Sequence, residues 1–125
     1  MNEINRYQAE AMRTCSIDYT SEDRMTNALL LSADHQAMLM HAALGLSSEA
    51  GEVAGILQKI YQGHSFDRMH LAKELGDVLW MVAEACEALG MQLSSVAEMN
   101  LAKLRARYPH GFDPERSLHR AEGDI

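Results

Sequence analysis

Residues 78–83 read Val-Leu-Trp-Met-Val-Ala, an unbroken apolar run inside a segment whose pattern is typical of an α-helix. A helix that is apolar on every side is normally buried on every side. A four-helix domain within a chain of 125 residues has little interior in which to bury such a helix alone. We therefore expect an all-α helix bundle that assembles as a dimer or a higher oligomer.

The rest of the composition also favours helices over strands. Hydrophobic residues make up 47% of the chain and aromatic residues only 6%, and the apolar residues are mostly Ala, Leu and Met, which are good helix formers. We expect one domain over residues 1–125, with four to five helices and a polar tail over 111–125. Helices are predicted over residues 2–15, 34–62, 67–89 and 94–108, with a connecting loop near 18–23 and a helical turn within 25–31.

Several residues mark where these helices should begin, end or pack closely. Capping and stop residues are expected from their types and places: Asp34 and Asp67 as N-caps, Ser95 with Glu98 as a capping box, and Gly63 and Gly90 as C-terminal stops. Three further glycines, Gly45, Gly51 and Gly55, fall inside one predicted helix. Because glycine weakens a helix by up to about 1 kcal/mol, they indicate close packing against a neighbour or a local break.

Two acidic pairs lie in consecutive predicted helices. Glu49 and Glu52 form the first, and Glu74 and Asp77 form the second. Residues three apart share a helix face, so each pair presents two carboxylates side by side. If the two faces meet, four acidic groups repel one another unless a cation lies among them. Oxygen ligands suit Mg²⁺, with Mn²⁺ as a second option.

Two other interpretations of the acidic pairs stay open from the residues alone. A single Glu-x-x-Glu is usually a solvated helix face, but two such pairs in apolar, glycine-rich helices argue against this here. A di-iron bundle needs Glu-x-x-His pairs, whereas both pairs end in a carboxylate. The nearest departure is Asp67 with His70, which makes iron the weaker alternative.

A second group of candidate residues lies on the last long helix. Asn100, Lys103 and Arg107 share one face, where an amide and two cations could hold phosphate oxygens. The alternative is again a solvated face. Lys59 and Tyr108 are further candidates for substrate contact. Core packing is expected for Trp80. His41 and His70 lie about two turns and one turn before an acidic pair and could support the metal ligands or act as general bases. Ordinary polar positions outside the catalytic set are the favoured interpretation.

Charge and cysteine content limit the partners of the chain. The formal net charge of -7 argues against binding a nucleic acid polymer, which needs a basic face, but not against a small phosphorylated ligand. No apolar run of membrane-spanning length occurs, so no membrane partner is expected. Cys15 and Cys86 are expected to be reduced, buried thiols in a cytoplasmic protein.

Three sequence blocks together resemble the MazG-like nucleoside triphosphate pyrophosphohydrolases. They are Leu-Gly-Leu-Ser-Ser-Glu-Ala-Gly-Glu-Val at 44–53, Leu-Ala-Lys-Glu-Leu-Gly-Asp-Val-Leu-Trp at 71–80, and Asn-Leu-Ala-Lys-Leu-Arg-Ala-Arg-Tyr-Pro at 100–109. The resemblance extends over about residues 7–116. It is the combination of the paired acidic motif with the Asn-x-x-Lys-x-x-x-Arg-Tyr-Pro ending that makes it specific.

The resemblance implies a MazG-like helix bundle assembled as a dimer or tetramer. It also implies Mg²⁺-dependent hydrolysis of a nucleoside triphosphate to the monophosphate and pyrophosphate. By that resemblance Glu49, Glu52, Glu74 and Asp77 would be metal ligands and catalytic residues, and Asn100, Lys103, Arg107 and Tyr108 would face the substrate. Some members of the family carry a further Glu where this chain has Ser48, so the residue that activates water is open, with Glu49 the first choice. A non-catalytic oligomer that binds metal or nucleotide is the alternative.

Overall fold

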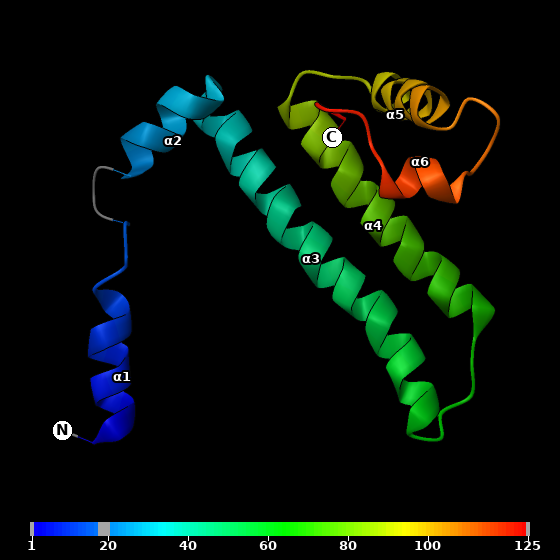
Figure 1. Cartoon of the computed structure of the whole chain (residues 1–125). Helices are drawn as coiled ribbons and strands as arrows, with labels where there is room; N and C mark the ends of the chain where they lie inside the picture. Colours follow the sequence, from blue (N-terminus) through cyan, green and yellow to red (C-terminus); the bar gives the residue numbers. More distant parts are fainter. Residues whose placement is uncertain (1, 18–20, 125) are drawn as a thin grey trace. The chain divides into compact units, whose positions relative to one another are not determined.

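The computed structural model describes residues 2–17 and 21–124, and these residues form six α-helices and no strands (Figure 1). The all-α prediction is confirmed, with more helices than the four to five expected. The helices are α1 (Glu3–Met12), α2 (Ser21–Leu29), α3 (Ala33–Tyr61), α4 (Arg68–Ala88), α5 (Leu93–Arg107) and α6 (Pro114–Leu118). The chain divides into two compact units, residues 1–36 and 37–125.

The first unit contains α1 and α2. Asn2 caps α1 by accepting a hydrogen bond from the backbone N–H of Asn5 at 2.9 Å, and α1 ends at Met12, three residues before the predicted end. The loop expected near 18–23 is wrong from Ser21 onward, because α2 begins there. The remaining loop positions, 18–20, lie outside the described residues. Leu30 takes a left-handed conformation, with φ of 53°, and this stops α2.

The start of α3 differs from the prediction by two residues. Ser32, rather than Asp34, caps this helix, because its side-chain oxygen accepts a hydrogen bond from the backbone N–H of His35 at 3.3 Å. Asp34 lies in the first turn of α3. The other end agrees with the prediction: Gly63 has φ of 90°, and the next residue, His64, donates its N–H back to the carbonyl of Lys59.

The two long helices α3 and α4 run side by side in opposite directions (Figure 1). Asp67 caps α4, as predicted, with its carboxylate accepting the N–H groups of Met69 and His70. Contacts between the helices place His41 beside Glu84 and Gly45 against Met81. Residue numbers therefore rise along α3 as they fall along α4. This antiparallel register brings the middle of α3 opposite the first half of α4.

Glycine permits close packing of α3 and α4 at one position. A Cβ atom added to Gly45 would collide with the side chain of Met81, whereas one added to Gly51 or Gly55 would meet nothing within 4 Å. The predicted close approach is therefore confirmed at Gly45 alone. The other two glycines face open space in this chain.

The final part of the second unit consists of α5, which packs against α4, and a tail that contains α6. The predicted Ser95–Glu98 capping box is wrong, because α5 begins at Leu93 and its N-cap, Gln92, makes no side-chain cap. Tyr108 ends α5 as predicted. Asp113 then caps α6, whose first residue is a proline.

Few side chains are fully buried in the single chain. Among the residues whose burial the structure describes, the buried hydrophobic ones are Ala42, Cys86 and Ala88, while Leu79 and Trp80 each keep 56% of their surface exposed. The expectation of core packing for Trp80 is therefore wrong within one chain, and so is the expectation of burial for Cys15, which is exposed. Cys86 is buried as expected, and both thiols are free. No helix in the described parts of the chain is long and apolar enough to span a membrane.

Candidate metal centre

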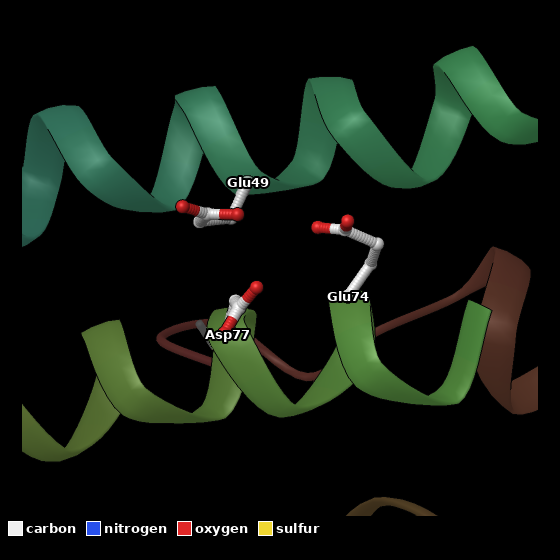
Figure 2. Close-up of side chains that lie close together, drawn as sticks. All are labelled: Glu49, Glu74 and Asp77. Atoms are coloured by element: carbon white, nitrogen blue, oxygen red, sulfur yellow. The ribbon is translucent and has the colours of Figure 1, made fainter. Parts of the chain in front are cut away.

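Three of the four predicted acidic residues come together between α3 and α4. Glu49 projects from α3 toward Glu74 and Asp77, which lie one turn apart on α4 (Figure 2). One carboxylate oxygen from each residue lies within 4.8 Å of the other two. We call these residues the acidic cluster. The spacing of three positions puts Glu74 and Asp77 on one face, and the antiparallel register puts Glu49 opposite them.

The fourth predicted residue, Glu52, does not join the acidic cluster. It lies one turn further along α3 than Glu49 and is exposed to solvent. Its charge still reaches the cluster, because it is among the charges that act on Glu49. Glu52 therefore contributes to the electrostatic potential of the site without offering an oxygen at the point where the other three meet.

The local environment raises the pKa of Glu49 above its ordinary value of 4.5. The largest cause is desolvation, and the negative charges of Asp77, Glu74 and Glu52 add to it. Each cause disfavours the ionised carboxylate in the absence of a cation. A divalent cation among these oxygens would reverse the balance, because it stabilises the ionised form.

The chemistry of the acidic cluster fits a hard divalent cation. All three groups offer carboxylate oxygens, the ligands that Mg²⁺ and Mn²⁺ prefer. Mg²⁺ takes six ligands and usually keeps several waters or phosphate oxygens besides one or two carboxylates. Three carboxylates on two helices are thus enough to hold such an ion and to leave positions for a substrate.

Two histidines lie on the facing sides of α3 and α4. His70 Nε2 lies 3.4 Å from Glu74 Oε1, one turn away on the same helix, so this histidine contacts a member of the acidic cluster. The sequence names His70 as a possible support for the acidic pair outside the catalytic set, and its spacing of four residues from Glu74 accounts for the contact. His41 instead joins the helices: its Nδ1 lies 2.5 Å from Glu84 Oε1, and its ring meets the Trp80 ring edge-on.

The residues predicted to face the substrate are only partly brought together. Lys103 and Arg107 line a cavity of about 460 Å³ whose other walls come from the tail. Asn100 and Lys59 are exposed, and neither lines this cavity. Tyr108 packs its ring against Phe112, with ring centroids 5.4 Å apart.

Sequence reasoning missed the partner of Arg107. The Asp124 carboxylate accepts two hydrogen bonds from this guanidinium, from Nε to Oδ2 at 2.8 Å and from Nη2 to Oδ1 at 2.7 Å. The two residues are separated by a turn, α6 and a further bend, so no helical spacing connects them. Nothing in the sequence pattern of the tail identified Asp124.

Comparison with known proteins agrees with this arrangement. Residues 38–112 match the model of the MazG nucleotide pyrophosphohydrolase domain. The chain is also similar to the Gene 37 protein of Mycobacterium phage L5, with 38% identity over 78 residues, which cover 58% of this chain and 68% of the phage protein. No solved structure matches. The matched residues include the whole acidic cluster and most of α3, α4 and α5, and the chain belongs to the MazG nucleotide pyrophosphohydrolase family.

Proposed function

We propose that this protein is a divalent-metal-dependent hydrolase that converts a nucleoside triphosphate to the monophosphate and pyrophosphate. The observation that carries the proposal is the convergence of three carboxylate oxygens from α3 and α4 within 4.8 Å. Membership of the family supports the reaction class. A role in removing unwanted nucleotides from the cellular pool follows from such an activity.

The residues of the acidic cluster would hold the cation, Mg²⁺ or Mn²⁺, with Glu52 able to contribute from the neighbouring turn. Such an ion supplies positive charge that neutralises the triphosphate and acidifies the attacking water. Water adds at phosphorus, the bond between the α- and β-phosphates breaks, and the water gives up one proton. Glu49 is our candidate to accept that proton, as a carboxylate of the acidic cluster that would not be fully used in holding the cation.

Cations on α5 would complete the site. Lys103 would stabilise the charge that develops on the leaving pyrophosphate, and Arg107 could do the same once it is free of Asp124. Asn100, Tyr108 and Lys59 remain candidates for contacts with the rest of the nucleotide. The task of these groups is to position the phosphates and to balance charge, and no covalent intermediate is required.

We also propose that the active form is a dimer or a tetramer. Large apolar side chains on α3 and α4 are exposed in the single chain, among them Leu44, Leu75, Leu79 and Trp80. Large apolar side chains exposed in this number normally mark an interface between subunits. Size-exclusion chromatography with light scattering measures the mass directly, and a monomer at micromolar concentration would contradict the proposal.

The activity is tested by pyrophosphate release from a panel of ribo-, deoxy- and modified nucleoside triphosphates, with Mg²⁺, with Mn²⁺ and with a chelator. Glu74→Gln keeps the shape of a cluster residue and removes its charge. Glu87→Gln makes the same change at an exposed position on the same helix and serves as the matched control. We expect metal-dependent release from one or a few substrates, lost in Glu74→Gln and kept in Glu87→Gln.

A negative result has a definite meaning. If no nucleotide in the panel yields pyrophosphate, while metal and nucleotide together still raise the melting temperature of the wild type, then the protein binds nucleotide without hydrolysing it. The fold would then serve as a binding or regulatory module.

A further inference from the structure

The cavity beside α5 is built around an internal ion pair. Arg107 donates two hydrogen bonds, of 2.8 and 2.7 Å, to the Asp124 carboxylate, and the two side chains are only 11% and 18% exposed. The hydrogen bond from Arg107 lowers the pKa of the Asp124 carboxyl group, and the charges of Arg107, Arg120 and Lys103 lower it further, whereas burial opposes the shift. Asp124 therefore lies within the field of three cations.

The same cavity concentrates positive charge in an acidic protein. Its lining includes Lys103 and Arg107 from α5 and Arg116 and Arg120 from the tail. These are four of the eleven lysines and arginines in a chain whose net charge is -7. Two acidic residues, Glu122 and Asp124, also line it, so the cations outnumber the carboxylates. We call this cavity the basic pocket.

The geometry of Asp124 is that of a bound oxyanion. Two carboxylate oxygens on the fork of a guanidinium occupy the positions that two oxygens of a phosphate group take in the same arrangement. The fork can hold one such partner at a time. A phosphate group that takes the Nε and Nη2 edge of this guanidinium must therefore compete with the Asp124 carboxylate for Arg107.

We propose that the basic pocket is a binding site for a pyrophosphate group, and that Asp124 is a built-in competitor which holds Arg107 until that group displaces it. If the pyrophosphate group is part of a nucleotide substrate, the proposal rests on the proposed function. Binding of inorganic pyrophosphate to the pocket does not depend on hydrolysis. The tail thus limits how readily phosphates reach α5.

The test is the affinity of the full-length protein for inorganic pyrophosphate, measured by isothermal titration calorimetry in EDTA so that no divalent cation takes part. Asp124→Asn removes the competing charge, and Glu98→Gln makes the equivalent change at an exposed position of α5 outside the pocket. We expect Asp124→Asn to bind pyrophosphate about tenfold more tightly than the wild type, a difference of about 1.4 kcal/mol. Glu98→Gln should bind like the wild type.

Equal or weaker binding by a folded Asp124→Asn variant would show that Asp124 only fastens the tail, and it would overturn the proposal. Arg120→Gln keeps the Arg107–Asp124 pair and removes a cation of the pocket, so it tests the site even if Asp124→Asn does not fold. We expect it to weaken pyrophosphate binding several-fold, and unchanged affinity would also overturn the proposal.

Parallel titrations identify the source of the phosphate. In EDTA, they show whether a nucleoside triphosphate competes with pyrophosphate for the pocket, and whether Asp124→Asn raises its affinity at least as much as that of pyrophosphate. Both results together would assign the pocket to nucleotide phosphates. A gain for pyrophosphate alone assigns the pocket to the inorganic product. Because these titrations need neither metal nor turnover, they can fail while hydrolysis succeeds, and the reverse.

Discussion

The acidic cluster and the basic pocket each have an excess of charge of one sign, but this charge is balanced in different ways. The carboxylates of Glu49, Glu74 and Asp77 repel one another, and the pKa of Glu49 is raised as a result of desolvation and these charges. In the basic pocket a carboxylate of the chain itself sits among the cations, and its pKa is lowered. The chemistry of the first site suits an external cation, whereas the positive charge of the second is already partly balanced by Asp124. A ligand therefore completes one site and must displace part of the other.

The largest expected effect comes from removing charge in the acidic cluster. Asp77→Asn should lower the rate of metal-dependent pyrophosphate release on the order of 10²-fold or more, because the metal loses a ligand and the triphosphate loses its neutralising charge. The equivalent change in the basic pocket, Asp124→Asn, should not lower the rate. Steady-state assays at saturating Mg²⁺ measure both. A similar loss in the two variants would erase the distinction between the sites.

Metal should stabilise the fold through the acidic cluster alone. At about 100 times the dissociation constant, Mg²⁺ or Mn²⁺ should add about 2.7 kcal/mol to the free energy of unfolding, seen as a rise in melting temperature that EDTA reverses. The rise should vanish in Glu74→Gln and persist in Asp124→Asn. Differential scanning fluorimetry provides the measurement. A metal-induced rise that survives in Glu74→Gln would place the cation elsewhere.

The packing of α3 on α4 should matter more at Gly45 than at Gly51. Gly45→Ala places a methyl group against the flexible end of the Met81 side chain, which must shift, and it should destabilise the protein by about 1 kcal/mol. Gly51→Ala meets nothing within 4 Å and should stabilise α3 by up to about 1 kcal/mol. Urea unfolding of both variants measures the difference. Equal destabilisation would mean that Gly51 also packs closely in the assembled protein, which would extend the proposed interface to the turn of α3 that carries Gly51.

The smallest expected effect is an opposite pH dependence of the two sites. Glu49 has a raised pKa in the folded state, so its contribution to stability falls as the pH rises from 4.5 through the folded pKa. Asp124 has a lowered pKa, so its contribution is present above 3.8 and is lost as the pH falls through the folded pKa. Without metal, Glu49→Gln should therefore raise the melting temperature at neutral pH, and Asp124→Asn should lower it. Melting curves between pH 3 and 8 in EDTA, with Glu98→Gln as control, measure both changes. Shifts of the melting temperature in the same direction for the two variants would contradict this account.

Much of the fold was predictable because helix signals are local. The caps at Asp67, Gly63 and Gly90 and the extents of α3 and α4 follow from residue types within a turn or two. The Ser95–Glu98 box was wrong because the N-cap of α5 is Gln92, three residues before Ser95. Ser95 is therefore the N3 residue, and Glu98 lies a turn further into the helix. Residue types alone do not decide between neighbouring start positions when the difference in free energy is small.

The acidic site was predictable in part for a similar reason. Spacing along a helix shows that Glu74 and Asp77 share a face, but it does not fix how α3 is rotated against α4. In the structure α3 is turned so that Gly45 meets Met81, Glu49 lies inside the cluster and Glu52 lies outside it. The pairing of Asp124 with Arg107 could not be predicted from helical spacing, because a turn and a short helix separate the two residues in the chain. Exposure of Trp80 depends on the neighbours of the whole chain, which no local pattern contains.

The pair of His41 and Glu84 ties α3 to α4 about 12 Å along the helix axis from Glu49, on the side away from the loop over residues 62–67. That loop joins the same two helices at the other end. The acidic cluster therefore lies between two connections that join α3 and α4, one on each side of it. These connections limit the separation of its carboxylates in the absence of an ion. The loop can therefore change in length or sequence with little effect on the site, because the contact of His41 with Glu84 still holds the two helices in register. We expect variation between relatives to collect in that loop, while the two helix faces stay matched to each other.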